Sequence, residues 1–188
     1  MTRQITDKKL GNQRFRQTEE AILGAFFGSK KVLNARIIVK RARISRSTLY
    51  RHHKTVYEIV PDYEEYILKK YDNLMRGLIK RNIRLKTAFH QMLIFILRNK
   101  RVFKIIMDKG NENILEKMIR RMEPKIMKIY RLPEDCGKML RIYEKEIAGV
   151  IDGWRRGGFV EDEMRVLADI MYLTATIRQR LGALTEQV

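Results

Sequence analysis

The sequence has 188 residues, of which 45% are hydrophobic and 33% are charged, and its formal net charge is +18 at pH 7. This share of hydrophobic residues can bury a core, so the composition excludes an intrinsically disordered chain. Its longest purely aliphatic and aromatic run, Met92 to Leu97, is far shorter than the roughly 18 residues that span a bilayer, so we expect a soluble, unexported protein without a membrane partner.

The positive charge is concentrated near the N-terminus. Residues 1–54 contain 14 Lys and Arg against 3 Asp and Glu, a net charge of +11, whereas residues 55–188 contain 26 against 19, a net charge of +7. A surface this positive attracts polyanions such as nucleic acid or anionic lipid. The sequence therefore predicts a small basic domain attached to a larger, more nearly neutral one.

Long patterns with a period of 3.6 residues and only 3 prolines predict an all-α fold. The first helix is expected to begin near Thr18, a good N-cap, and to end at Gly28. A second, short helix should follow the N-cap candidate Asn34. Ser45 can then cap a third helix that runs through Leu49.

A fourth helix is predicted from Thr55, which stands at capping-box spacing from Glu58, to about Lys80. Pro61 either kinks this helix or marks the point where it restarts. Further helices are expected at 86–98, at 101–109, at 112–130 with a bend or break at Pro124, and from the 133–137 region to about 156, followed by a last one at 164–181.

The last two helices bear on assembly. The helix at 139–154 has one apolar stripe, whereas the helix at 164–181 has two, so that both of its sides need cover. A second subunit would supply that cover in a homodimer; the alternative is a helix buried entirely in its own core. The candidate dimer-interface residues are Val150, Trp154, Met164, Leu167, Met171 and Ala175.

The stretch RARISRSTLYRHHKT, residues 41–55, contains five Lys or Arg, two histidines and no acidic residue. Two short helices that meet at a tight turn, the second one basic, are typical of a helix-turn-helix that binds double-stranded DNA. With Ile44 and Leu49 inward, Arg46, Ser47, Thr48 and Tyr50 would be free to reach bases or backbone. Phosphates would be neutralised by Arg36, Lys40, Arg41, Arg43, Arg51 and Lys54. Taken alone, the same residues also fit an ordinary solvated helical surface.

The string EAILGAFFGSKKVLNARIIVKRARISRSTLYRHHKTVYEIV, from Glu20 to Val60, resembles the N-terminal domain of the tetracycline-repressor (TetR) family of bacterial transcription regulators. The matching features are Ile22, Leu23, Phe26, Ile38, Ala42, the ISRSTLYRH core from Ile44 to His52, and Ile59. Residues 143–159 also look like the second-last helix of the ligand-binding domain in some branches. The specific resemblance covers about 40 residues.

This resemblance implies a three-helix DNA-binding domain at 1–58 and a helical regulatory and dimerisation domain at 59–188. It implies a repressor that binds a palindromic operator as a homodimer at the bacterial nucleoid, in the cytoplasm, and that responds to a small-molecule effector. The positions carried over to the DNA-facing surface are Ser45, Arg46, Thr48, Tyr50, Arg51 and His52, and the last two helices would pair the subunits.

Three positions depart from the family pattern. Arg43 occupies the turn position usually held by glycine, so a positive φ is expected there. His53 replaces a packed aromatic residue, and Val56 replaces a lysine that commonly meets phosphate. Neighbouring helical residues diverge by about 100°, so we expect His52 to touch phosphate or water and His53 to fill a packing position, without a shared metal ion.

Candidate effector contacts in the larger domain are Phe89, Met92, Phe95, Met107 and Trp154, although residues at helical spacing are more often plain core. We find no catalytic motif, metal-ligand set or cofactor site, and expect no enzyme. The rival interpretation is a basic protein that packages nucleic acid or binds RNA without sequence preference.

Overall fold

A computed structural model of the chain describes residues 13–27, 34–81, 83–109, 113–130 and 136–185. All regular structure in these ranges is helical, which confirms the predicted all-α class. The chain divides into two compact units, Met1–Tyr66 and Ile67–Val188, here called the N-terminal unit and the C-terminal unit. The expected boundary after residue 58 comes earlier than this division, because Ile59 and Tyr63 pack with the core of the N-terminal unit.

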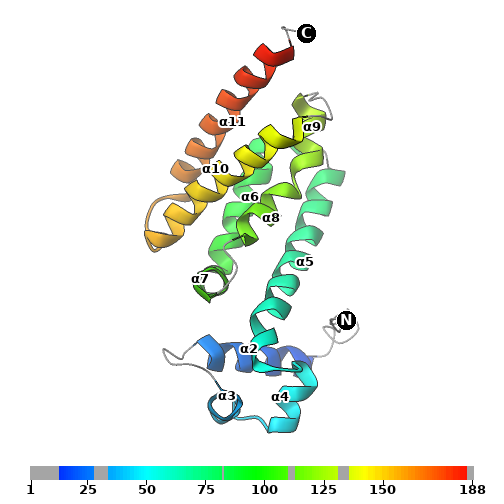
Figure 1. The fold of residues 1–188 in the computed structure, drawn as a ribbon, viewed down its shortest axis with the longest axis vertical. Helices are drawn as coiled ribbons and strands as arrows, with labels where there is room; N and C mark the ends of the chain where they lie inside the picture. Colours follow the sequence, from blue (N-terminus) through cyan, green and yellow to red (C-terminus); the bar gives the residue numbers. More distant parts are fainter. Residues whose placement is uncertain (1–12, 28–33, 82, 110–112, 131–135, 186–188) are drawn as a thin grey trace. The chain divides into compact units, whose positions relative to one another are not determined.

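The N-terminal unit is built from short helices around one apolar core (Figure 1). Its elements are α2 (Gln13–Phe27), α3 (Ala35–Ala42), α4 (Arg46–His52), a 3-10 turn (Val56–Glu58) and the first turns of α5 (Ile59–Lys80). Helix α2 contributes Ile22 and Phe26, one turn apart, while Ile38, Leu49 and Ile59 come from α3, α4 and α5. Each helix thus buries one apolar stripe and leaves its other side to solvent.

The start of α2 differs from the prediction. The helix already includes Gln13, and Thr18 lies inside it, where its hydroxyl donates to the carbonyl of Arg14 at 2.9 Å. A threonine in a helix interior often makes this bond to the carbonyl four residues earlier. Thr18 is therefore not an N-cap.

Of the two alternatives for Pro61, a kink in the helix or a restart of the helix, the structure is closer to the second, since α5 begins at Ile59. The proline stands in the first turn, where the backbone needs no donor, so the helix runs without interruption from Ile59 to Lys80. The capping box predicted between Thr55 and Glu58 is not observed: Thr55 makes no side-chain capping bond, and the Glu58 carboxylate accepts from the Lys54 amide at 3.0 Å instead of the Thr55 amide. The expected helix end at Lys80 is confirmed.

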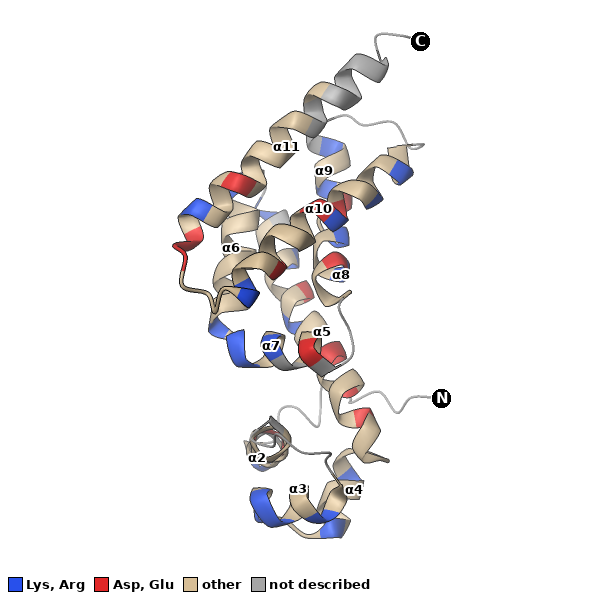
Figure 2. Cartoon of the chain, turned by 60° about the vertical axis from the view of Figure 1, so that its left-hand side comes forward, with Lys and Arg blue, Asp and Glu red and all other residues tan. Residues whose placement is uncertain are grey.

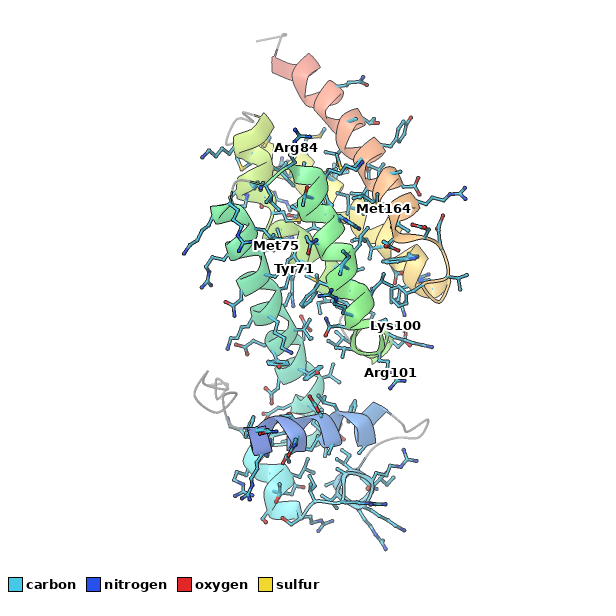
Figure 3. The ribbon with its side chains drawn as sticks, turned by 180° about the vertical axis from the view of Figure 1, so that it is seen from behind. Tyr71, Met75, Arg84, Lys100, Arg101 and Met164 are labelled. Atoms are coloured by element: carbon cyan, nitrogen blue, oxygen red, sulfur yellow. The ribbon has the colours of Figure 1, made fainter. Side chains whose placement is uncertain are left out.

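The C-terminal unit is a bundle in which α10 packs against α8 and α11, while α6 packs against α11 and α7. Besides the rest of α5 it contains α6 (Leu85–Arg98), α7 (Lys100–Lys109), α8 (Ile114–Arg120), α9 (Glu123–Tyr130), α10 (Gly137–Arg156) and α11 (Glu163–Thr185). Figure 3 shows Tyr71 and Met75 on the side of α5 that faces α6. In the described part of the chain no helix combines the length and the apolar composition needed to cross a bilayer.

The predicted helix at 112–130 is two helices. The break falls at Arg121 and Met122, and Pro124 is the second residue of α9 rather than the point of the break. Proline is well tolerated in a first turn, where its missing N–H is not needed. The predicted opening at 133–137 lies partly outside the described residues; α10 begins at Gly137.

Polar contacts tie the helices of the C-terminal unit together. Arg120 donates from both Nε and Nη2 to the buried Glu144 carboxylate, with the shortest contact at 2.8 Å, which joins α8 to α10. Arg155 on α10 reaches Asp108 on α7 at 2.6 Å and Asp152 at 2.7 Å. These two arginines hold α7 and α8 against α10.

Two buried tyrosines in this unit differ in the environment of their hydroxyl groups. The hydroxyl of Tyr143 on α10 is hydrogen-bonded to Thr174 on α11. The hydroxyl of Tyr71 on α5, whose ring packs 5.6 Å from that of Phe95, has no hydrogen-bond partner within the described residues. A buried polar group left without a partner costs about 1–3 kcal/mol.

We therefore expect Tyr71→Phe to raise the free energy of unfolding of the C-terminal unit by about 1 kcal/mol, because it removes an unsatisfied hydroxyl. Tyr143→Phe is the matched control and should lower that free energy by about 1 kcal/mol, because it breaks a hydrogen bond. Denaturant titration followed by the fluorescence of Trp154, the single tryptophan, measures both. Equal effects of the two substitutions would contradict the prediction.

Candidate nucleic-acid interface

A tight connection joins α3 to α4. The Asn34 side chain accepts from the Ile37 amide at 3.0 Å and caps α3, as predicted. At the other end Arg43 adopts φ 53° and ψ 44°, and the Ile44 amide donates to the Val39 carbonyl at 3.1 Å. This left-handed ending favours glycine, so the positive φ expected at Arg43 is confirmed and costs about 1 kcal/mol.

Hydroxyl groups organise the start of α4. Ser45 Oγ accepts from the Thr48 amide at 3.0 Å, which confirms Ser45 as the N-cap. The same oxygen lies 2.8 Å from the hydroxyls of Ser47 and Thr48, and Arg51 Nη2 donates to the Thr48 hydroxyl at 3.3 Å. The hydroxyls of Ser45 and Thr48 therefore hold the helix start in place and are already engaged within α4.

Most of the side chains predicted to face DNA are exposed. The exposed residues are Arg36, Arg43, Ser45, Arg46, Ser47, Tyr50, Arg51 and Lys54, while Thr48 is half-buried. Tyr50 retains 50% exposure, which is high for an aromatic side chain. No Asp or Glu stands between Glu20 and Glu58, so the surface of α3 and α4 is cationic throughout.

His52 does not belong to this exposed set. Its side chain is only 5% exposed; Nδ1 lies 2.5 Å from Glu19 Oε1, and the ring stacks on Phe15 at a centroid distance of 4.1 Å. His52 is the last residue of α4, on the side that turns back to α2. This corrects the expectation that His52 faces DNA.

His53 fills a buried position, as expected, but it does so with two carboxylate partners. Its Nδ1 lies 2.9 Å from Asp62 and its Nε2 lies 3.2 Å from Glu19. A carboxylate is an acceptor, so both ring nitrogens must carry a proton to donate to both partners. The geometry indicates an imidazolium held between α2 and α5.

The contacts between these carboxylates and histidines also shift the pKa values of His53 and Glu19. Burial alone would lower the pKa of His53, but the hydrogen bonds to Asp62 and Glu19, together with their charges, raise it to about 9. Burial alone would raise the pKa of Glu19, but the hydrogen bonds from His52 and His53 and the charges of these imidazoles lower it to about 2. Each shift means that the charged form is stabilised in the folded state.

Neither Glu19 nor Asp62 was predicted as a functional residue. The sequence carries one signal for Glu19: it stands three residues before Ile22 and seven before Phe26, on the buried stripe of α2. A carboxylate on such a stripe needs a buried partner, and so does a histidine in place of a packed aromatic residue. Together these two rules would have pointed to a contact between Glu19 and His53.

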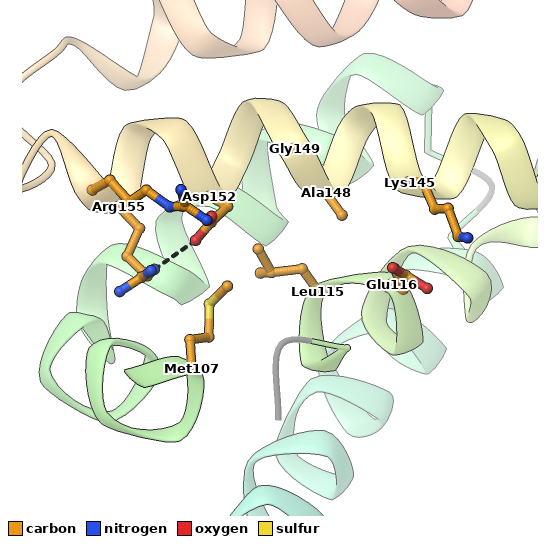
Figure 4. A pocket seen from close by; sticks show the side chains of 9 residues that line it. Met107, Leu115, Glu116, Lys145, Ala148, Gly149, Asp152 and Arg155 are labelled. Atoms are coloured by element: carbon orange, nitrogen blue, oxygen red, sulfur yellow. Dashed lines mark hydrogen bonds and ion pairs between the residues drawn. The ribbon is translucent and has the colours of Figure 1, made fainter. Parts of the chain in front are cut away.

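The candidate effector residues are mostly core. Phe89 and Met92 are fully buried, Phe95 is half-buried between the rings of Tyr71 and Phe103, and Trp154 is buried with its indole N–H donated to the Glu161 carbonyl at 2.8 Å. Only Met107 lines a hollow of about 200 Å³. The other lining residues are Leu115, Glu116, Lys145, Ala148, Gly149, Asp152, Arg155 and Arg156. In Figure 4 the labelled residues of α10, from Lys145 to Arg155, lie above Met107 and Leu115.

The candidate dimer residues separate into buried and accessible ones. Trp154 and Leu167 are buried in the core of their own unit, so their side chains are not available to a second subunit. Val150 and Met171 are half-buried, whereas Met164 and Ala175 are exposed. Of the two alternatives for the last helices, burial in their own core accounts for Trp154 and Leu167. Met164 and Ala175, and in part Val150 and Met171, remain accessible to a second subunit.

The chain matches no protein-family model, no curated protein and no solved structure. Within the residues that the structure describes, no group of three or more His, Cys, Asp or Glu is arranged to hold a metal ion.

The His53 contacts predict how stability depends on pH. Because its pKa is raised from 6.5 to about 9 on folding, its contribution is complete below pH 6.5 and is lost as the pH rises through about 9. We expect the N-terminal unit to lose about 1–3 kcal/mol over this interval. The opposite shift of Glu19 keeps its contribution present above pH 4.5 and removes it toward pH 2.

Chemical denaturation followed by far-UV circular dichroism measures this loss, while Trp154 fluorescence reports on the C-terminal unit separately. NMR titration resolves the ring of His53 directly, since the chain has only three histidines. In His53→Gln the loss between pH 6.5 and about 9 should shrink. An unchanged loss in that variant would show that other groups cause it.

Proposed function

We propose that this protein is a DNA-binding transcriptional regulator in which α3 and α4 form a helix-turn-helix. The observation that carries the proposal is the exposed outer side of α4, where Arg46, Ser47, Tyr50 and Arg51 point to solvent while Leu49 is buried. Figure 2 shows Lys and Arg on both α3 and α4. A short basic helix held by its inner side suits the major groove of DNA.

The side chains divide by chemistry into those that read bases and those that bind phosphate. Arg46, in the first turn of α4, suits a bidentate contact to guanine O6 and N7, and Ser47 beside it can donate to a base edge or a phosphate. Arg36 on α3 and Arg43 in the turn suit phosphate contacts, which fix register without reading sequence. We assign specificity to the start of α4 and general affinity to its flanks.

We further propose that the protein acts as a homodimer on a palindromic operator. The outer side of α11 supports this: Met164, Ala168, Tyr172 and Ala175 are exposed, and Tyr172 retains 74% exposure. A two-fold dimer covers such an apolar face with its own copy and presents two DNA-binding helices to two half-sites. Repression as the regulatory sign follows from the resemblance to the TetR family.

The hollow beside Met107 is our candidate site for a small effector. Its volume of about 200 Å³ is below the range of about 300–1,000 Å³ that is usual for drug-sized ligands. Its lining combines apolar residues such as Leu115 and Ala148 with residues of both charges, such as Lys145 and Glu116. A compact molecule with one charged group fits these walls best.

A second function has support from the net charge of +18, which by itself suffices for sequence-independent binding of nucleic acid. Selection of binding sites from a random DNA pool, followed by footprinting, separates the two. A regulator should enrich one motif and protect two half-sites about 10 base pairs, or a multiple of that, apart. A pool without an enriched motif would favour the second function.

For the regulator, we expect Arg46→Ala to weaken binding to the selected site by roughly tenfold to a hundredfold and to relax its sequence preference, because a base contact is lost. Arg36→Ala should weaken selected and random DNA alike and reduce the salt slope by about one. Fluorescence anisotropy at several salt concentrations measures both changes.

Arg76→Ala removes the same charge from an exposed position on α5, outside α3, α4 and the proposed dimer face, and serves as the control, with affinity expected to stay near that of the wild type. If Arg46→Ala weakened selected and random DNA equally, Arg46 would be a phosphate contact and the assignment of specificity would be wrong.

A further inference from the structure

One carboxylate on α2 holds two neighbouring histidines at the end of α4. Glu19 Oε1 lies 2.5 Å from His52 Nδ1, and Glu19 Oε2 lies 3.2 Å from His53 Nε2. Two successive helical residues would diverge by about 100° and could not share one carboxylate. They do so here because α4 ends at His52, and His53 has the extended backbone of a C-cap, with φ −128° and ψ 133°.

The group extends from there to α5. His53 Nδ1 lies 2.9 Å from Asp62, so the ring links the α2 carboxylate to the first turn of α5. The side chains of Glu19 and Asp62 are each 11% exposed, and that of His53 is 1% exposed. Contacts at this depth exchange little with water, and they hold both rings at fixed distances from α2 and α5.

Helix α4 depends on such outside contacts. It has seven residues, and helices shorter than about 12 residues are marginal by themselves. Ser45 fixes its start and Leu49 its middle, whereas its end is held through His52 and His53. A rotation of the last turn would move Tyr50 and Arg51 on the outer side.

We propose that Glu19 is a positioning residue of the DNA-binding surface, which sets the orientation of α4 through His52 and His53 without touching DNA. This inference rests on the proposed function and adds to it a residue on the opposite side of the helix from the bases. It explains why a carboxylate and a histidine occupy positions on an otherwise apolar stripe. An apolar pair would fill the same space but would not fix the angle of the last turn by hydrogen bonds.

The substitution that tests this is Glu19→Gln. A glutamine oxygen can accept from only one imidazole, and its NH2 group can donate to the other ring only if that ring gives up the proton on the facing nitrogen. Glu19→Gln therefore removes the charge from both contacts and weakens them, because hydrogen bonds to a carboxylate are stronger than those to a neutral amide. We expect affinity for the selected DNA site to fall about tenfold, the equivalent of one displaced base contact, with affinity for random DNA unchanged within about twofold.

Glu20→Gln is the matched control. It removes the same charge from the next residue of α2, which is exposed, and should leave both affinities at the wild-type value after allowance for the changed net charge. Hydrogen exchange of the α4 amides in the full chain provides a readout without DNA: in Glu19→Gln, but not in Glu20→Gln, protection of the last turn should fall while that of α3 is retained.

The dependence of DNA affinity on pH provides a further test, because a residue that only supports folding would not change that dependence. The titratable groups that act on His53 are Glu19 on α2 and Asp62 on α5, and the ring of His52 on α4 lies beside it. In the wild type, affinity for the selected site should fall as the pH approaches 9, where His53 loses its second proton. In Glu19→Gln that fall should begin at a lower pH, because His53 keeps only the Asp62 carboxylate.

The outcomes are distinguishable. Equal affinity of Glu19→Gln and wild type for the selected site, or equal α4 protection in the two, overturns the positioning role and leaves the proposed function intact. A parallel loss of selected and random binding, with α3 protection lost as well, means that Glu19 only supports folding and also overturns the inference. If the wild type selects no DNA site at all, the proposed function fails, and this inference fails with it.

Discussion

The burial of Leu49 among Ile22, Ile38 and Ile59 is the constraint on which the DNA-binding proposal depends. A helix of seven residues gains little from its own hydrogen bonds, and one buried leucine contributes about 2 kcal/mol. Each residue of a helix points in a direction that is fixed relative to its neighbours. The burial of Leu49 therefore determines which side chains of α4 remain exposed. The cationic surface is therefore a consequence of the apolar core beneath it.

Local signals in the sequence were sufficient for the helix starts at Asn34 and Ser45, since each cap is a contact between residues three apart. The prediction that Thr18 is an N-cap was wrong because a threonine can cap a helix only if the chain before it is not helical. The residues before Thr18 already belong to α2. The place of Glu19 on the buried stripe of α2 can be read from the sequence, but its contact with His52 and the inward turn of that ring could not be predicted. They depend on where the chain leaves α4 and on a contact between residues 33 positions apart.

In the C-terminal unit, hydrophobic periodicity predicted most helices but not what would cover them. Trp154 and Leu167 lie on the expected stripes and are covered by their own unit, while Met164 and Ala175 on the same helix pair are exposed. A stripe looks the same in sequence whether its cover is intramolecular or a second subunit. The residues that line the hollow beside Met107 come from three helices, α7, α8 and α10, which periodicity along one helix cannot bring together.

The absence of any acidic residue between Glu20 and Glu58 also affects the folded protein by itself. Cations gathered on two short helices repel one another, and the strained backbone at Arg43 adds to the cost of folding. Any polyanion that binds the folded form relieves this repulsion and stabilises it by mass action. Purified protein should consequently retain cellular nucleic acid, and its melting temperature should depend on whether the buffer anion is chloride, phosphate or heparin.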